Sequence, residues 1–190
     1  MGGDRMKLLG ISGTIVGSKT KTAVGAVLAE AKGLLPELEC ELLDLKQYDM
    51  QFCDGRPFQN YNEDTRKAVE TVLSADFYVI GTPVFQSSLT GALKNLFDLL
   101  PPDAFRHKVV GFVATGGTYQ HYLVIENQLK PIAGYFRAFV APGSVYLHND
   151  HFDAAGALQD AEVLSRIRRL SEELVLMQSA WKTDSQIVVL

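Results

Sequence analysis

Short apolar runs that alternate with amphipathic segments constrain the fold of this chain more than any other feature. Met6–Ile11, Phe77–Gly81 and Val109–Ala114 are continuous apolar runs of strand length, as expected for strands that are covered on both faces. Two further strands are expected at Cys40–Leu45 and Ala138–Ala141. Strands separated by helices indicate a parallel sheet with helices on both of its sides.

Apolar residues at helical spacing mark the segments between these runs. We expect helices over Thr22–Lys32, Thr65–Ala75 and His121–Leu129, another between Leu89 and Leu100 that stops at Pro101, and a long final helix after Ala154. Five strands in this arrangement match the doubly wound, flavodoxin-like order 2-1-3-4-5 in a three-layer α/β sandwich. The sequence shows no linker and no internal repeat, so residues 1–190 are expected to form a single domain.

Charge and composition exclude several classes of protein. The net charge of −4 argues against a nucleic-acid partner and against an anionic membrane surface. No apolar run reaches the length of a membrane span, and Met1–Arg5 does not read as a secretory leader. Cys40 and Cys53 lack C-x-x-C spacing, so we expect two ordinary thiols in a cytoplasmic protein.

The loop after the first strand reads like a phosphate loop with altered spacing. Gly13–Thr20 spells G-x-x-x-G-S-K-T, whereas a nucleoside triphosphatase needs G-x-x-x-x-G-K-[ST]. Hydroxyls, two lysines and a helix N-terminus suit a terminal monophosphate better than a triphosphate or a pyrophosphate. The alternative is that these hydroxyls simply cap the helix. The candidate phosphate ligands are Ser12, Thr14, Ser18, Lys19, Thr20, Lys21 and Thr22.

The loops after the third and fourth strands complete a candidate site, because the carboxyl ends of parallel strands meet at one edge of a sheet. Thr82, Pro83, Val84 and Phe85 offer a stiff apolar surface for a flat heteroaromatic ring. Alternatively, Phe85 packs in the core and Pro83 only shapes a turn. In the next loop a double glycine lets the backbone approach a ligand, or only permits a turn with positive φ. Its candidate residues are Thr115, Gly116, Gly117 and Thr118.

Other motifs carry less weight. The H-x-x-H of His148–His151, followed by Asp153, lacks a convincing third ligand, so we interpret it as a solvated turn and predict no metal site. The sequence contains neither a G-x-S-x-G elbow nor an H-E-x-x-H motif.

Together these stretches resemble the flavodoxin-like NAD(P)H-dependent FMN reductases, in particular the branch of the alkanesulfonate-type flavin reductases. The resemblance runs from about Met6 to Val145. It is carried by Gly13-Thr14 with Ser18–Thr22, by Thr82–Phe85 with Ser88, by Gly91–Lys94 and Leu96–Pro101, by Ala114–Thr118 and by Leu129–Pro131. Family members commonly have an arginine where this chain has Ile15-Val16, which leaves the cation role to Lys19 or Lys21.

The resemblance implies that the first loop holds the 5′-phosphate of FMN. Hydride would pass from NADPH or NADH to the flavin and on to an acceptor such as free flavin, a quinone or an azo compound, with no catalytic side chain. It also implies a homo-oligomer, a tetramer built from dimers with a dimer as the alternative, and a flavin-dependent monooxygenase as a partner. We expect the oligomer to bury the apolar residues of Leu89–Leu100 together with Tyr119, Tyr122 and Leu123.

Two other functions stay open from the sequence. One is an electron carrier or redox-signalling module that binds FMN without nicotinamide turnover; such carriers present a strongly acidic face, which a net charge of −4 with 18 basic residues hardly provides. The other is a protein that binds a phosphate ester without flavin.

Overall fold

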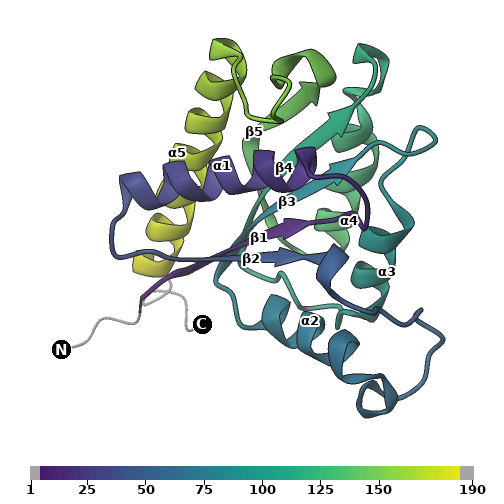
Figure 1. Cartoon of the computed structure of the whole chain (residues 1–190). Coiled ribbons are helices and arrows are strands. Elements are labelled where there is room, and N and C mark those ends of the chain that lie inside the picture. Colours follow the sequence, from purple (N-terminus) through teal and green to yellow (C-terminus); the bar gives the residue numbers. More distant parts are fainter. Residues whose placement is uncertain (1–4, 185–190) are drawn as a thin grey trace.

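The computed structural model, which describes residues 5–184, contains one sheet of five parallel strands in the order β2-β1-β3-β4-β5 (Figure 1). This confirms the predicted strand order and the flavodoxin-like three-layer fold. The switch in strand order lies at β1 and β3, so ligands are expected beyond the carboxyl ends of these strands. The strands are β1 (Lys7–Ser12), β2 (Glu39–Asp44), β3 (Phe77–Pro83), β4 (Val109–Gly116) and β5 (Phe139–His148).

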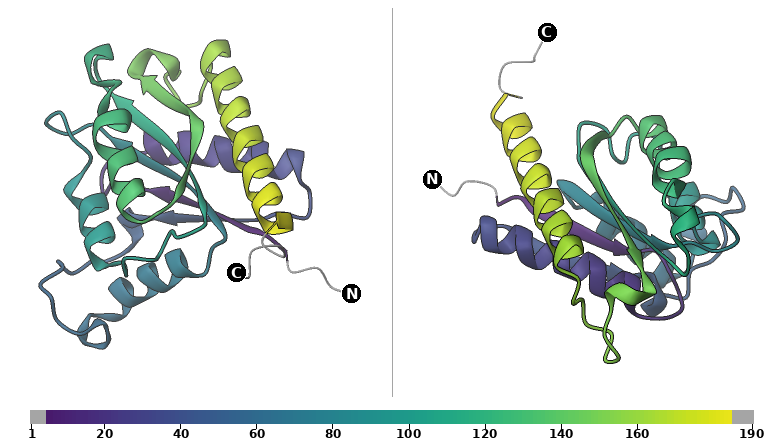
Figure 2. Two further views of the ribbon diagram at one scale, coloured as in Figure 1. Left: turned by 180° about the vertical axis from the view of Figure 1, so that it is seen from behind. Right: turned by 90° about the horizontal axis from the view of Figure 1, so that it is seen from above.

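Helices cover both faces of the sheet (Figure 2). On one face lie α1 (Lys19–Leu34) and α5 (Ala161–Asp184); on the other lie α2 (Glu63–Leu73), α3 (Gly91–Leu99) and α4 (Lys130–Tyr135). Successive strand residues point to opposite faces, so each strand contributes to two cores. None of the helices within residues 5–184 combines the length and the apolar composition that crossing a bilayer requires.

The apolar side of α3 belongs to the core of the chain itself. Leu93, Leu96, Phe97 and Leu100 are buried against the sheet and against α4, and Leu89 packs on the same cluster. The prediction that these residues form a subunit interface is therefore wrong. The helix is amphipathic as predicted, but the sheet and α4 together bury its apolar side, so little of that side is left for a partner subunit.

β5 is longer than the sequence indicated. The expected strand ended at Ala141, whereas the strand continues through Pro142 and Gly143 to His148. The register of its pairing with β4 shifts between Val110 and Phe112. An edge strand tolerates proline because one side of its backbone needs no partner strand. The extension carries the chain up to the edge of the sheet where ligands bind.

The expected helix over His121–Leu129 is confirmed only in its second half, and that half is π-helical. The chain forms a 3₁₀ turn at Tyr119–His121 and a π-helical turn at Ile125–Leu129, and α4 follows directly. Pro131 has no N–H to donate and its ring crowds the carbonyl one turn earlier, which disfavours a regular α-helix here. The final helix begins at Ala161, seven residues later than the expected start at Ala154. The residues before it form a turn instead, in which the Asp153 carboxylate accepts hydrogen bonds from Ala155 N and Ala157 N.

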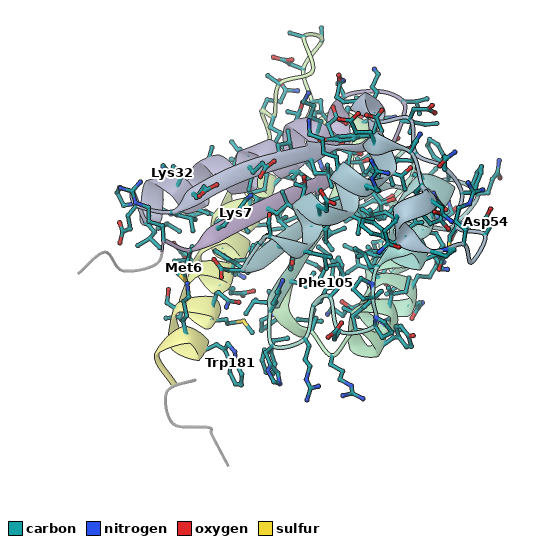
Figure 3. The ribbon with its side chains drawn as sticks, turned by 90° about the horizontal axis from the view of Figure 1, so that it is seen from below. Met6, Lys7, Lys32, Asp54, Phe105 and Trp181 are labelled. Atoms are coloured by element: carbon teal, nitrogen blue, oxygen red, sulfur yellow. The ribbon has the colours of Figure 1, made fainter. Side chains whose placement is uncertain are left out.

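A buried phenol yields a test of this packing. Tyr78 on β3 is fully buried against Phe105 (labelled in Figure 3), with the ring centroids 4.7 Å apart. Its hydroxyl donates to Val72 O (2.8 Å) and accepts from Lys108 Nζ (2.9 Å). Tyr78→Phe should lower the free energy of unfolding by about 1–3 kcal/mol, because it leaves these groups without their partner. Urea denaturation measures the loss; Tyr135→Phe, at an exposed position, should change nothing.

The same phenol makes stability fall at alkaline pH. Burial, with a smaller contribution from Asp76, raises the pKa of Tyr78 above its usual range. The folded chain therefore keeps this proton above about pH 10, where the unfolded chain releases it. The stabilisation is fully present below that pH and is lost as the pH rises further. Tyr78→Phe should flatten this alkaline decline.

Candidate functional site

The loops after β1, β3 and β4 meet at one cavity beyond the carboxyl ends of the strands. Its volume of about 380 Å³ lies in the range of small-molecule sites. The sequence predicted these three loops as the site, and the fold brings them together with a residue from the turn after β5. The cavity is lined by Val16, Gly17, Ser18, Lys19, Thr20, Pro83, Val84, Phe85, Thr115, Gly116, Gly117 and Asn149.

The first loop is short and leads directly into α1. Thr14 Oγ1 accepts from Val16 N (3.2 Å) and donates to Val16 O (3.0 Å), which folds the loop over itself. Gly17 follows with a φ of 73°, a conformation that favours glycine. α1 then begins at Lys19, three residues earlier than predicted, so that Ser18 stands at the N-cap position inside the cavity lining.

The N-terminus of α1 differs from those of the other long helices. Side chains cap α2 through Asn62 to Thr65 N (2.9 Å), α3 through Thr90 to Leu93 N (3.1 Å) and α5 through Asp160 to Val163 N (2.8 Å). Ser18 makes no such bond, and the first turn of α1 contains no acidic residue. Its amides therefore stay available, and with the helix dipole they favour an anion. The alternative that the loop hydroxyls only cap the helix does not hold for Ser18.

The predicted phosphate ligands fall into three groups. Ser18, Lys19 and Thr20 line the cavity, whereas Ser12 at the end of β1 and Thr14 in the loop are buried and do not line it. The buried hydroxyl of Ser12 has no hydrogen-bond partner in the described part of the chain. It could therefore donate or accept one hydrogen bond at the start of this loop. Lys21 and Thr22 lie outside the lining: Lys21 Nζ is paired with Asp44 Oδ2 at 3.1 Å, at the end of β2.

Lys19 crosses the mouth of the cavity towards the turn after β5. Its Nζ donates to Asn149 Oδ1 (2.8 Å) and lies 5.4 Å from the centre of the Phe152 ring. Behind it, the hydroxyls of Thr20 and Thr115 are 2.9 Å apart and join α1 to β4. Because Lys19 is also the first residue of α1 and lines the cavity, its ammonium group can supplement the first-turn amides in binding an anion there.

The second loop places apolar side chains at the cavity. Pro83, Val84 and Phe85 line it, and Phe85 is 46% exposed, so the alternative that Phe85 packs in the core is wrong. Val84 N donates to Thr115 O (2.7 Å), which fixes this loop to the end of β4. Thr82 is buried and does not line the cavity; its hydroxyl donates to Pro83 O and accepts from Thr90 N, which stabilises the backbone of the loop.

The two glycines of the third loop have different surroundings. A Cβ on Gly116 would lie 2.0 Å from the Tyr146 hydroxyl, whereas one on Gly117 would meet only Asn149 Nδ2, at 3.7 Å. Neither glycine has a positive φ, so the alternative that they only permit such a turn is wrong. Gly117 O is 2.8 Å from His148 Nε2. Thr118 lies outside the lining, and its carbonyl accepts from the Tyr146 hydroxyl.

The H-x-x-H segment is tied into its own turn. His148 N donates to His151 Nδ1 (3.1 Å), and Tyr119 stacks on the His148 ring with the centroids 4.4 Å apart. Within the described part of the chain, no three His, Cys, Asp or Glu side chains gather as metal ligands do. The two imidazoles thus help to hold the turn that brings Asn149 to the cavity.

A larger cavity, of about 740 Å³, lies behind the glycine loop, with Tyr146 in its wall. Its charged groups already have partners: Arg166 pairs with Glu162, and Glu126 pairs with Lys130 at 2.6 Å. The helix N-terminus near it, that of α5, is capped by Asp160. The smaller cavity therefore remains the better candidate for a phosphorylated ligand.

Comparison with known proteins agrees with this geometry. The family model of the NADPH-dependent FMN reductases matches residues 6–152. The chain belongs to this family. An NAD(P)H-dependent FAD/FMN reductase of Geobacillus thermodenitrificans is 64% identical over 94% of this chain and 96% of its own length. The NADH-dependent FMN reductase SfnF of Pseudomonas fluorescens is 31% identical over 88% and 89%, respectively.

Among solved structures, the flavoenzyme NAD(P)H:(acceptor) oxidoreductase FerB of Paracoccus denitrificans superposes with a TM-score of 0.73. It covers 92% of this chain and 98% of its own, and its 15% identity shows the common fold alone. Membership of the FMN reductase family confirms the predicted resemblance and the predicted enzyme class, an oxidoreductase that uses FMN and NAD(P)H.

Sequence reasoning missed three residues of this family member's cavity. Val16 and Gly17 were passed over in favour of the hydroxyls around them, although Gly17 is the residue that turns the loop into α1. Asn149 was read as part of a solvated turn. The signal that could have found it is the apolar run Val145–Leu147 just before it, which extends β5 to the ligand-binding edge.

Proposed function

We propose that this chain is a flavin reductase whose FMN occupies the 380 Å³ cavity, with the phosphate at the first turn of α1 and the ring between Phe85 and Gly116–Gly117. The observation that carries this proposal is the uncapped N-terminus of α1, which opens into a cavity with an apolar wall and a backbone approach at Gly117. Six of the candidate ligands do not line this cavity and are left out of the proposed direct contacts: Ser12, Thr14, Lys21, Thr22, Thr82 and Thr118.

When bound, FMN supplies the hydride chemistry, by accepting a hydride from NAD(P)H and passing it on to an acceptor. The residues of the chain bind the flavin and orient it. The first-turn amides of α1 and Lys19 Nζ hold the negative charge, while Ser18 and Thr20 add hydroxyls. Pro83, Val84 and Phe85 exclude water from one side of the ring, and Gly117, which has no Cβ, leaves room for the other side of the ring. No side chain needs to take up or release a proton, so we propose no catalytic residue.

We further propose free flavin as the acceptor, because the 64% identical relative is named an FAD/FMN reductase. The test is steady-state oxidation of NADPH and of NADH with FMN, FAD, a quinone or an azo dye as the only acceptor. We expect oxidation to depend on added flavin. If the FMN-loaded chain consumes neither nucleotide with any of these acceptors, the electron-carrier alternative holds instead.

We also propose a homo-oligomer, either a dimer or a tetramer. Support comes from the exposed side chains of Tyr119 (57%), Tyr122 (58%) and Leu123 (42%) beside the glycine loop, since contiguous apolar surface of this kind is commonly buried by symmetric association. A cytoplasmic location is proposed from the two free thiols, Cys40 and Cys53. That a flavin-dependent monooxygenase takes over the reduced flavin stays a prediction.

A further inference from the structure

Phe85 is carried by a two-residue hairpin with an unusual backbone. Phe85 N donates to Ser88 O (2.9 Å) and Ser88 N donates to Phe85 O (3.0 Å), which closes the turn. The two central residues, Gln86 and Ser87, have φ values of 47° and 65°. Turns with two left-handed residues strongly favour Asn-Gly, and neither glutamine nor serine adopts this conformation readily. The hairpin therefore needs support from outside itself.

Gln128 provides this support with both ends of its amide. Its Nε2 donates to Ser87 O (3.0 Å), and its Oε1 accepts from Ser88 Oγ (2.6 Å). The carbonyl of Ser87 can only accept, so it must face the NH₂ end of the amide, which fixes the orientation of the side chain. One side chain thus holds both the tip and the closing residue of the turn.

The backbone of Gln128 is itself well anchored. It lies in the π-helical turn Ile125–Leu129, whose two end residues are buried in the core. Pro131, two residues after this turn, disfavours regular α-helical hydrogen bonding within it. A half-buried glutamine on a turn that is held at both ends gives the hairpin a fixed attachment point on the body of the protein.

We propose that Gln128 is a positioning residue for the flavin ring: it holds the Phe85–Ser88 hairpin in its left-handed turn, so that Phe85 forms the wall of the cavity. Gln128 is not part of the cavity lining and acts only through the hairpin. This inference rests on the proposed function, because it takes the ligand beside Phe85 to be a flavin.

Substitution of Gln128 tests this role. Gln128→Ala should weaken the binding of FMN by about tenfold, the equivalent of one or two neutral hydrogen bonds. The binding of riboflavin should be weakened by the same factor, because the lost contact concerns the ring and not the phosphate. In the flavin-free protein, the amides of Phe85 and Ser88 should exchange with solvent faster. Asn127→Ala, at the exposed neighbouring position on the same turn, is the matched control. It should leave the affinity for FMN, the affinity for riboflavin and the exchange of the two amides unchanged.

A rescue separates positioning from a general loss of structure. Gln86→Asn combined with Ser87→Gly gives the turn the residues it favours, so it should no longer need Gln128. In that background, Gln128→Ala should bind FMN and riboflavin as tightly as the parent. Parental flavin affinity and unchanged amide exchange in the single Gln128→Ala variant would overturn the proposal, as would failure of the Asn-Gly turn to restore affinity. The exchange of the two amides in flavin-free protein reports on the hairpin even if the ligand is not FMN.

Discussion

Lys19→Met should weaken FMN binding by about ten- to a hundredfold and leave riboflavin binding unchanged. Lys19 is the first residue of the uncapped turn of α1 and lines the cavity, so a phosphate bound there would neutralise its charge. A hydrogen bond to a charged group contributes about 1.5–3 kcal/mol, and riboflavin lacks that charge. Quenching of flavin fluorescence by the protein gives both dissociation constants under identical conditions.

Lys21 provides the matched control for this change. It lies two residues away on the same helix, but its ammonium group pairs with Asp44 outside the cavity. Lys21→Met should therefore leave the ratio of the FMN and riboflavin dissociation constants as it is. If Lys21→Met raises the ratio of the FMN to the riboflavin dissociation constant as much as Lys19→Met does, general electrostatic attraction accounts for the effect, and the placement of the phosphate is wrong.

Gly117→Val should reduce kcat/KM for NADPH by about a hundredfold and leave the melting temperature close to that of the parent. A Cβ at this position has free space on the protein side, since only Asn149 Nδ2 comes within 4 Å, and the backbone φ is not positive. The added side chain would instead occupy cavity volume beside the proposed ring. Hydride transfer depends on a close approach of donor and acceptor, and a displacement of about 1 Å costs roughly that factor.

Gly116 shows the contrasting behaviour that makes this test specific. A Cβ there would collide with the Tyr146 hydroxyl, so Gly116→Ala should lower the melting temperature, and an added Tyr146→Phe should restore part of the loss. Melting temperature, flavin content and steady-state turnover are measured on the same preparations. Normal turnover in a folded, FMN-loaded Gly117→Val protein would contradict the placement of the ring.

The sequence was sufficient for the sheet and for the three loops because both follow from local patterns. Continuous apolar runs such as Phe77–Gly81 mark strands buried on two faces, and the topology then requires the loops that follow them to share one edge. The hydroxyl-rich loop before α1 and the double glycine were recognisable for the same reason: their composition departs from that of ordinary connecting turns.

Features that depend on tertiary context could not be predicted. Pro142 ends a central strand but not an edge strand, and the position of β5 at the edge is a property of the whole sheet. Asn149 was not predicted because the apolar run Val145–Leu147 before it was not recognised as a continuation of this strand. The side chain of Lys21 turns towards Asp44 at the end of β2, with which it forms an ion pair. The α3 leucines are buried because α4 packs over the same core. The bonds from Gln128 to the hairpin join residues about 40 positions apart, as in Ser88–Gln128.

Anaerobic mixing of the FMN-loaded protein with NADPH, or with NADH, tests the central claim most directly. The long-wavelength absorption of bound FMN should bleach within the time of a single turnover and return when oxygen or free flavin is admitted. The Gly117→Val protein, loaded with FMN to the same extent, should bleach about a hundredfold more slowly. Bound FMN that keeps its absorption in the presence of either nucleotide would contradict the account.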